Sequence, residues 1–394
     1  MDADVLVVGA GPAGSIAALV LARAGARVRL IDRARFPRDK LCGDTLNPGS
    51  LSILDRLGLS TPIRARAAAV TGMMVTGPGA RVSADYPHRL CGASITRRDL
   101  DLILLNAAID AGAHFECGVA VREPIVDERG RVHGVRVTSD GHARDLHASM
   151  VIAADGRGSR LASRLHLSAY AQRPRRWAFG AYFAGVAGMT ARGEMHIRPD
   201  GYIGVAPLTD GVTNVSVVRD AANLPPGDQQ SFVREALALD RELRERFARA
   251  EQVSRVSVLG PLAVDARGSG CPGLLLAGDA AGFVDPMTGD GLRFAIRGGE
   301  LAAQAALEEV ESGEPAFARL HALRAREFTG KWRINRALRS IVGSPRALDL
   351  AAMISKHWSK PVAYLIGVAG DVNLVGGNGG GGGNGERNHT GERL

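Results

Sequence analysis

The sequence has few aromatic residues, few cysteines and no long apolar run, and each shortage excludes a class of protein. Aromatic side chains make up only 5% of the 394 residues, and the 49 lysines and arginines behind the net charge of +8 are spread along the chain. Nucleic-acid-binding proteins concentrate basic charge on one face or add aromatic platforms, so no nucleic-acid partner is expected. A basic surface suits an anionic cofactor, an acidic substrate or a peripheral contact with a membrane equally well.

The four cysteines lie far apart, and no two of them form a Cys-x-x-Cys pair. This spacing favours neither a zinc site nor a disulfide scaffold, so we expect no metal and a reducing, cytoplasmic location. The N-terminal Met1–Asp4 lacks the basic start of a secretory signal. The apolar stretch Pro361–Ala369 is the nearest to a membrane span but falls short of the roughly 18 residues required. Association with a membrane surface stays open, as does the oligomeric state.

What the sequence does contain is a dinucleotide-binding fingerprint at its start. An apolar strand over Asp4–Val8 leads into the glycine loop Gly9–Gly14, a helix over Ser15–Ala24 follows, and a second strand over Arg27–Ile31 ends at Asp32. In a G-x-G-x-x-G loop the first glycine makes the tight turn, the second lets the backbone approach a pyrophosphate, and the third lets helix and strand pack closely. The carboxylate at position 32 is placed to accept hydrogen bonds from a ribose. The pattern alone does not separate FAD from NAD.

A second glycine-rich loop lies late in the chain, directly after the apolar strand Leu274–Ala277. The stretch Gly278–Gly299 begins with Gly-Asp-Ala-Ala, and its second half carries residues such as Leu292 and Ile296 at helical spacing. A strand, a small-residue loop and a helix N-terminus bring backbone N–H groups and the positive end of a helix dipole to one place. We therefore expect an extended polar ligand to be held there.

Between the two loops the sequence alternates helical and strand-like segments. The expected elements are a helix over Ser94–Ala111, paired strands within Glu116–Val137, a strand over Met150–Asp155, an antiparallel sheet over Trp177–Val218 and one charged helix over Ser231–Gln252. The predicted fold is a doubly wound, Rossmann-like α/β domain with an inserted, mostly antiparallel sheet domain and a helical C-terminal region.

The predicted domain limits follow from this alternation. The α/β domain is assembled from residues 1–70, 96–165 and 263–330, and the sheet domain from residues 71–95 and 166–262. Residues 331–375 are expected to be helical. The glycine-rich stretch 376–394 is of low complexity and cannot bury a core, so we expect it to be a disordered tail.

Five sequence elements, taken in order, resemble the FAD-dependent family that contains p-hydroxybenzoate hydroxylase-like aromatic hydroxylases, flavin halogenases and geranylgeranyl reductases. They are the glycine loop at 9–14, Phe-Pro-Arg-Asp-Lys-Leu-Cys-Gly-Asp at 36–44, Thr-Arg-Arg-Asp-Leu-Asp at 96–101, Ala-Asp-Gly-Arg-Gly-Ser-Arg at 154–160 and Gly-Asp-Ala-Ala at 278–281. The resemblance covers the chain from its first residues to about residue 299. It implies FAD as the cofactor. Because the sequence has a single fingerprint, NAD(P)H is expected as a transient co-substrate.

The resemblance also implies where FAD is held. The first glycine loop takes the ADP half, Arg97 reaches the phosphates and ribityl chain, Asp155 lies near the pyrophosphate, and Asp279 holds the ribityl hydroxyls. The predicted cofactor-binding residues are Gly9, Gly11, Pro12, Ala13, Gly14, Asp32, Arg33, Cys42, Gly43, Asp44, Arg97, Asp155, Gly156, Asp279, Gly291 and Leu292.

The candidate catalytic residues lie on the loop from Pro286 to Leu292, which the resemblance places against the isoalloxazine ring. They are Pro286, Gly289 and Gly291, together with Tyr202, for which core packing and substrate contact are both open. Cys42 is either a redox or proton-donating residue or an inert buried cysteine. His196 is either a base or a structural histidine.

The branch within the family decides the reaction. Cys-Gly-Asp at 42–44 and Gly-Phe-Val-Asp-Pro at 282–286 resemble the geranylgeranyl-reductase branch most, and no Trp-x-Trp pair of the halogenase kind is present. The reductases' Tyr-x-Trp-x-Phe-Pro segment corresponds to 202–207, where Gly204 replaces the tryptophan. This loss favours a monooxygenase that uses NAD(P)H and O2 to hydroxylate or epoxidise a hydrophobic aromatic, polyketide or prenylated molecule of secondary metabolism. The alternatives are a reductase of C=C bonds in an isoprenoid or quinone, and a flavin- or lipid-binding protein without turnover.

Overall fold

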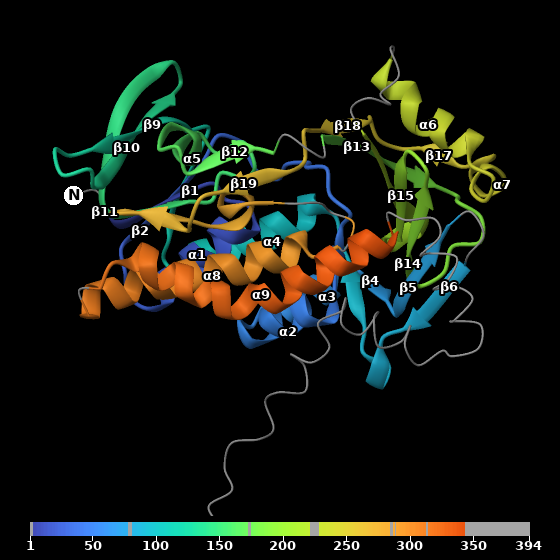
Figure 1. Cartoon of the computed structure of the whole chain (residues 1–394), viewed down its shortest axis with the longest axis horizontal. Coiled ribbons are helices and arrows are strands. Elements are labelled where there is room, and N and C mark those ends of the chain that lie inside the picture. The colour runs from blue at the N-terminus through green and yellow to red at the C-terminus, as the bar shows by residue number, and fades with distance from the viewer. Residues whose placement is uncertain are drawn as a thin grey trace, which may run out of the picture.

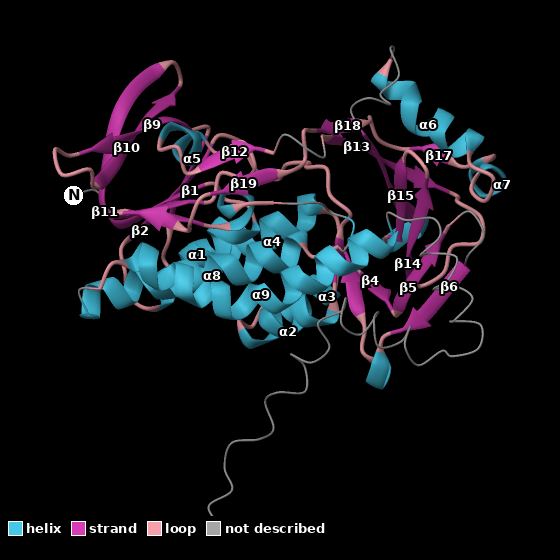
Figure 2. Ribbon diagram, in the orientation of Figure 1, coloured by secondary structure: helices cyan, strands magenta, loops and turns pink. Residues whose placement is uncertain are grey.

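The computed structural model describes residues 3–77, 81–171, 175–220, 228–283, 287, 289–312 and 314–342. Two lobes lie side by side, one built on a parallel sheet with a layer of helices and the other on a second sheet (Figures 1 and 2). The predicted tail at 376–394 and most of the predicted helical region at 331–375 lie outside the described residues.

The parallel sheet has the order β21-β11-β1-β2-β8, and β20 pairs with β21 in antiparallel fashion at one edge. Its strands are β1 (Ala3–Val8), β2 (Val28–Asp32), β8 (His114–Cys117), β11 (His142–Ala153), β20 (Gly270–Cys271) and β21 (Leu274–Leu276). The strands come from three separate parts of the sequence, as the fold prediction requires. The carboxyl ends of β1, β2, β11 and β21 therefore meet along one edge of the sheet.

Both faces of this sheet are covered, and the alternation of side chains along β1 divides the core in two. Val5 and Val7 belong to the cluster under the helices, whereas Leu6 and Val8 belong to the cluster on the opposite face. The helices on the first face are α1 (Pro12–Arg23), α4 (Arg97–Asp110), α8 (Gly291–Ser312) and α9 (Ala316–Val342), with the shorter α2 (Pro48–Arg56) and α3 (Ser60–Arg64) beside them. On the second face β9 (Ala120–Val126) and β10 (Val132–Ser139) continue from β11 as an antiparallel meander, and α5 (Arg160–Arg164) packs beside them.

The second sheet has the order β17-β13-β16-β15-β14-β5-β6, with β18 also paired to β13. Its strands are β5 (Gly72–Thr76), β6 (Arg81–Asp85), β13 (Arg176–Ala184), β14 (Arg192–Arg198), β15 (Gly201–Pro207), β16 (Val212–Asp220), β17 (Glu251–Gln252) and β18 (Ser257–Leu259). The pairs from β13 to β14 are antiparallel, as predicted for Trp177–Val218. β14 and β5 are parallel, so the sheet is mixed.

Two smaller sheets connect the lobes. One consists of β3 (Thr45–Leu46), β7 (Gly92–Ser94) and β4 (Ala68–Val70), and the other of β12 (Ser168–Tyr170) and β19 (Val264–Ala266). The domain limits drawn from the sequence pass close to these strands and stay a prediction.

The single helix expected over Ser231–Gln252 is wrong. The chain forms α6 (Gln229–Leu239) and the short α7 (Arg244–Phe247), and residues 251–252 are strand β17. Asp240 separates the two helices, because its Oδ1 accepts hydrogen bonds from the backbone N–H groups of Glu242 and Leu243. Such local bonds from an aspartate compete with a continuing helix.

Candidate functional site

The first glycine loop has the geometry that its sequence predicts. Gly9 has a φ of +100°, and a side chain on it would collide with the Ala154 carbonyl of the neighbouring strand. A Cβ on Gly14 would overlap the carbonyl oxygen of Gly9, so α1 can approach β1 only through a glycine. The helix begins at Pro12, three residues earlier than expected, because proline fits the first turn, where its missing N–H is not needed. Because Pro12 has no N–H, the N–H groups at the start of α1 that lack a partner within the helix are those of Gly11, Ala13 and Gly14.

Asp32 lies beside this loop at the carboxyl end of β2. Its Oδ2 accepts a hydrogen bond of 2.8 Å from the Ala10 N–H, and its Oδ1 accepts one of 2.8 Å from the Ala34 N–H. The carboxylate therefore braces the glycine loop, and its remaining lone pairs are available to a ribose. The predicted neighbour Arg33 is exposed; burial raises the pKa of Asp155, and the nearby charge of Arg33 offsets only part of that rise.

Arg97 is the first residue of α4, whose N-cap Thr96 accepts a hydrogen bond from the Asp99 N–H. The guanidinium is buried and forms two bonds to Asp101, of 2.7 and 2.8 Å. Arg38 reaches the same carboxylate at 3.1 Å. Side-chain nitrogens of Arg38 and Arg97 lie 3.6 and 3.8 Å from where a Cβ on Gly11 would stand. Two guanidinium groups thus flank the glycine that is expected to meet the pyrophosphate.

A second group of polar side chains lies around Asp155 and Asp279, at the ends of β11 and β21. Among the described residues, the buried Oδ1 of Asp155 and the buried Nε of Arg157 have no hydrogen-bond partner. Burial raises the pKa of Asp155 and lowers the pKa of Arg157, whose charge is supported by nearby Asp279. Burial also lowers the pKa of Lys40, whose ammonium lies 3.8 Å from where a Cβ on Gly156 would stand.

The loop after β21 begins with a short 3-10 turn, Gly278–Ala281, and packs against α1. Gly278 has a φ of +60°, and a Cβ on it would lie 2.9 Å from Ala13 Cβ. In α8, Gly299 lies so close to Ala13 that a side chain there would collide with its carbonyl. The predicted residue Ala13 therefore contacts both ends of the Gly278–Gly299 stretch. Asp279 is brought to the same edge of the sheet as the first glycine loop.

The start of α8 is fixed from three sides. Asp290, just before the helix, meets Lys331 of α9 at 3.2 Å and Asn47 at 3.3 Å. A Cβ on Gly291 would lie 3.4 Å from the Phe283 ring, and Leu292 points into the helix-side core. Gly289 is exposed and has a φ of +70°. The candidate Pro286 lies outside the described residues.

The segment 36–44 crosses from the α/β lobe to the second sheet. Burial raises the pKa of the Cys42 thiol, so this cysteine stays protonated at neutral pH. Gly43 is exposed. Leu41 lies against Gly180 of β13, where a side chain would collide with it. Asp44 is buried and accepts hydrogen bonds from the second sheet. Its predicted contact with the cofactor stays a prediction.

One face of the second sheet forms an apolar wall on the side of the flavin loop. Its buried members are Ala178, Ile197, Tyr202, Val218 and Leu262, with Leu41, Val75, Val82, Met195, Leu259, Phe283 and Met287 packed against them. Tyr202 is 4% exposed, so its ring is part of the wall. A Cβ on Gly204, next to it on the same face, would have only one atom within 4 Å, the Ser216 carbonyl oxygen at 3.9 Å. The wall joins residues of the second sheet to Phe283 and Met287 of the loop before α8.

His196 lies on the opposite face and is structural. Its Nε2 is 2.9 Å from Glu194, its Nδ1 is 2.9 Å from Thr76, and it is fully buried. Arg246 of α7 completes the group with two bonds to Glu194, of 2.7 and 2.9 Å. This cluster fixes α7 to the back of the sheet.

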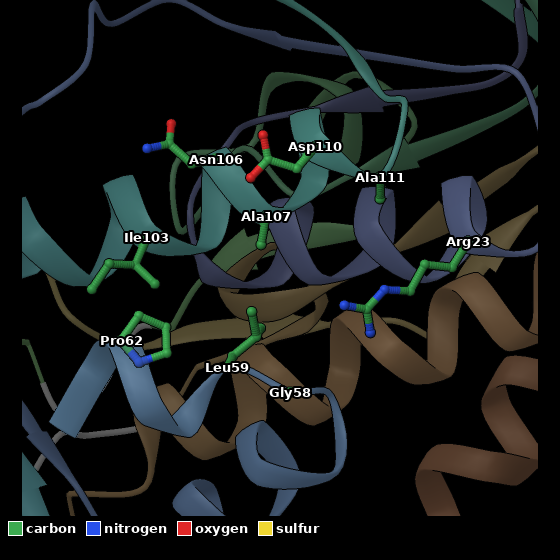
Figure 3. A pocket seen from close by; sticks show the side chains of 9 residues that line it. All are labelled: Arg23, Gly58, Leu59, Pro62, Ile103, Asn106, Ala107, Asp110 and Ala111. Carbon is green, nitrogen blue, oxygen red and sulfur yellow. The ribbon is translucent and has the colours of Figure 1, made fainter. Parts of the chain in front are cut away.

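A hollow of about 500 Å³ lies elsewhere, between the loop before α3 and the second half of α4 (Figure 3). Arg23 of α1 and Asp110 of α4 are at its rim. None of the predicted cofactor or catalytic residues lines it. It is therefore separate from the candidate site.

The described residues fit FAD. Gly9, Gly11 and Gly14 leave a backbone cradle that any Cβ at 9 or 14 would destroy. Arg38 and Arg97 lie beside Gly11, where the pyrophosphate is expected, and among the residues that the structure describes the buried Asp155 Oδ1 and Arg157 Nε have no hydrogen-bond partner. A doubly wound sheet with such a loop at the end of its first strand defines a dinucleotide-dependent protein.

The comparisons with known proteins agree with this class. Residues 2–325 match the model of the "FAD binding domain" family, and the chain belongs to that family. The menaquinone reductase of Mycolicibacterium smegmatis is 31% identical over 390 residues, which cover 95% of this chain and 92% of that protein. Digeranylgeranylglycerophospholipid reductase 2 of Methanopyrus kandleri is 30% identical over 80% of this chain and 79% of its own. The protein is an FAD-dependent oxidoreductase.

Solved structures share the fold. A geranylgeranyl bacteriochlorophyll reductase-like protein of Thermoplasma acidophilum superposes with a TM-score of 0.81, at 24% identity, over 96% of both chains. The flavin-dependent brominase Bmp2 gives the same TM-score at 21% identity over 93% of both chains. At these identities the likeness shows the fold alone. Among the described residues, no helix has the length and apolar character needed to cross a bilayer.

Sequence reasoning missed several residues of this region. They are Arg38, Lys40, Arg157, Tyr182, Asn214, Asp290, Arg324 and Lys331. An aspartate directly before a helix is a helix-start signal, so Asp290 was open to prediction. The segments at 36–44 and 154–160 contain Arg38, Lys40 and Arg157, but nothing in their local pattern says which side chain turns inward. Tyr182 and Asn214 join this region only because strands distant in sequence pair in the folded sheet.

Proposed function

We propose that the protein reduces carbon–carbon double bonds of an isoprenoid-bearing lipid, of the prenylated quinone class, with electrons that NAD(P)H delivers to the bound FAD. The observation that carries the proposal is the apolar wall of the second sheet, which faces the start of α8 through Phe283 and Met287. An isoprenoid chain offers only apolar surface, and such a wall stabilises it by removing that surface from water. The reductase names of the relatives support the same substrate class.

Separate groups of residues are expected to hold the cofactor, hold the substrate and supply the proton. The glycine loop, Arg97 and Asp279 are expected to hold FAD, which supplies a hydride when it is bound and reduced. Leu41, Met195 and Tyr202 would hold the isoprenoid double bond against the flavin side of the wall and exclude water. The second hydrogen of the product has to arrive as a proton. The protonated Cys42 thiol lies on the segment that crosses between the lobes and is one candidate donor.

A monooxygenase reaction is the less well supported of the two candidate functions. The sequence favoured it because Gly204 replaces the tryptophan of the reductase motif, but the reductase relatives cover nearly the whole chain and give that reaction no support. Gly204 leaves open space in the wall, which changes the shape of the pocket without removing its apolar character. Halogenation is disfavoured too, because the sequence has no Trp-x-Trp pair of the halogenase kind.

The test is a substrate assay under two atmospheres. FAD-loaded protein is reduced with NADPH or NADH in the absence of oxygen and mixed with menaquinone or with a geranylgeranyl lipid. After any quinol has been reoxidised to the quinone, mass spectrometry should show a product that has gained two hydrogen atoms in its isoprenoid chain. Oxygen uptake that depends on substrate, together with a product that has gained one oxygen atom, would instead establish the monooxygenase and refute the reductase. Comparison of NADPH with NADH in the same assay identifies the electron donor.

A further inference from the structure

A buried carboxylate joins the 36–44 segment to the second sheet. Asp44 has no exposed surface, and its Oδ2 accepts hydrogen bonds of 2.8 Å from the Tyr182 hydroxyl and 2.6 Å from the Asn214 side-chain amide. Tyr182 on β13 and Asn214 on β16 are directly paired across the sheet. Two neighbouring strands therefore present donors to one oxygen atom of the other lobe. The same Asn214 amide also donates to the Cys42 carbonyl at 2.9 Å.

The other oxygen of Asp44 has no such support. Among the described residues, its buried Oδ1 has no hydrogen-bond partner. A buried carboxylate with one unsatisfied oxygen is costly when ionised and much less so when protonated. Burial raises the pKa of Asp44 to about 7, although the bonds from Tyr182 and Asn214 and the charge of Arg97 all act in the opposite direction.

The charged and titratable groups around Asp44 do not remove this cost. Arg97 of α4 is the cation that acts on it, but Asp101 already takes two hydrogen bonds from that guanidinium. From its own segment Asp44 faces the Cys42 thiol, which stays neutral. On the second sheet, burial raises the pKa of the Tyr182 hydroxyl, and the nearby carboxylates of Asp44 and Asp39 raise it further. Asp44 is thus the group in this cluster that can take up and release a proton near neutral pH.

We propose that Asp44 stores the proton for substrate reduction and passes it through the Tyr182 hydroxyl. This inference rests on the proposed function. When Asp44 is protonated, its O–H can donate to Tyr182 Oη, which frees the tyrosine O–H for the half-buried side that Tyr182 presents between the lobes. Bound and reduced FAD would supply the hydride to one carbon of the substrate's double bond, and the Tyr182 hydroxyl would donate its proton to the other carbon. The Asp44 proton then moves to Tyr182, and the carboxylate left behind is reprotonated from solvent. In this relay Asp44 acts on the substrate only through Tyr182, so it is a positioning residue.

The first measurement uses the protein without FAD. Asp44→Asn keeps an oxygen that can accept from Tyr182 and Asn214, but it carries no titratable proton. Because the folded state binds the Asp44 proton more tightly than the unfolded state, wild-type stability should fall as pH rises from about 4 to about 7. Asp44→Asn should lack this part of the slope. Asp145→Asn, which removes an exposed carboxylate paired with Arg136, should retain it. Identical slopes in wild type and Asp44→Asn would overturn the proposal.

The second measurement uses the FAD-loaded enzyme. At saturating FAD, Asp44→Asn and Tyr182→Phe should each lower the turnover number about a hundredfold, the usual order for loss of a proton-transfer group. In wild type the rate should fall as pH rises past neutrality, and this fall should vanish in Asp44→Asn. An unchanged pH profile in that variant would refute the relay. If Asp44→Asn does not fold, Tyr182→Phe decides the point, because a phenylalanine with full turnover also refutes it.

Failure of the proposed function gives a different pattern. If wild type reduces no double bond, the proposed reaction is wrong and the relay that serves it is overturned. The stability measurement on the FAD-free protein still reports whether Asp44 holds its proton. A protein with the stability slope and without reduction therefore separates the two results.

Discussion

At the scale of single residues, the site depends on positions where no Cβ fits. Gly9 and Gly14 bring two backbone segments within contact of each other, and Gly299 does the same for α8 and α1. Within the part of the chain that the structure describes, one buried atom of each of two neighbouring side chains, Asp155 Oδ1 and Arg157 Nε, has no hydrogen-bond partner. The glycines therefore fix the backbone of the site, and the polar side chains around it are available to contact the ligand.

Gly14 provides the strictest test of the loop. Gly14→Val adds a branched side chain whose Cβ would overlap the Gly9 carbonyl oxygen, so α1 has to move away from β1. We expect FAD binding to be abolished, because the N–H groups at the start of α1 move with the helix. Flavin fluorescence titration measures the loss, and circular dichroism checks that the remaining secondary structure persists. Gly330→Val, in α9 and with no atom within 4 Å of where its Cβ would stand, controls for the general effect of valine in place of a helical glycine. A Gly14→Val protein that binds FAD normally would mean the loop is not the cofactor site.

Asp279 and Gly291 should separate retention from reactivity. Asp279→Ala removes a charged acceptor for the ribityl hydroxyls, and such a bond contributes roughly 1.5–3 kcal/mol, or one to two decades in affinity. Gly291→Val places atoms against Phe283, at the edge of the apolar wall, and should impair turnover more than FAD binding. The FAD dissociation constant and the NAD(P)H oxidation rate are to be measured for both variants. Normal FAD retention in the first and full turnover in the second would make the Gly278–Gly299 stretch a structural cap only.

At the scale of elements, the helices that follow the flavin loop hold it in place. Two side chains of α9 contact this region. The buried Arg324 donates a hydrogen bond of 3.1 Å to the Ala281 carbonyl, and Lys331 forms an ion pair with Asp290. Burial lowers the pKa of Arg324 to about 10, which still leaves it charged at neutral pH. The 3-10 turn and the start of α8 are therefore fixed from behind, by a helix that follows them in the chain.

The cluster on the back of the second sheet predicts a pH effect on stability. Burial alone would raise the pKa of Glu194, but hydrogen bonds from His196 and Arg246 outweigh it and hold the pKa below 4.5. A lowered folded-state pKa gives stability that is present above about pH 4.5 and lost as pH falls further. Glu194→Gln should cost about 1.5–3 kcal/mol at pH 7 and flatten the acid side of the stability curve.

Urea denaturation at several pH values measures this effect. FAD affinity should not change, because the cluster lies on the face of the sheet away from the apolar wall. Equal stability of Glu194→Gln and wild type at pH 7 would contradict the assignment of His196 and Glu194 as structural residues.

At the scale of the whole molecule, FAD should stabilise the protein as a unit. The residues expected to contact it come from the ends of β1, β2, β11 and β21 and the start of α4, which are distant in sequence. A ligand that binds only the folded state adds about 2.7 kcal/mol at a hundredfold excess over its dissociation constant. Removal of FAD should therefore lower the melting temperature, and ADP should restore part of the loss through the first glycine loop. An FAD-free protein with an unchanged melting temperature would exclude binding across these segments.

The sequence by itself determined the first βαβ unit, the strand–loop–helix around Asp279, the class of cofactor and the existence of the helix predicted over Ser94–Ala111, which in the structure begins at Arg97 because Ser94 belongs to β7. These features depend on short-range periods, on helix caps and on glycines within one loop, so neighbouring residues suffice to specify them. It failed at Asp240, where the aspartate side chain accepts hydrogen bonds from the N–H groups of Glu242 and Leu243 and α6 ends.

Only the tertiary structure decided how distant segments meet. Asp44 finds Tyr182 and Asn214 across 138 and 170 positions of the sequence. β5 pairs in parallel with β14, which puts Thr76 beside His196 and makes that histidine structural. When an apolar face is buried, polar groups from separate segments are buried with it and must form hydrogen bonds with one another. Which group becomes the partner depends on how the strands of the sheet pack together. The local pattern around Asp44 could not show which strands would cover it.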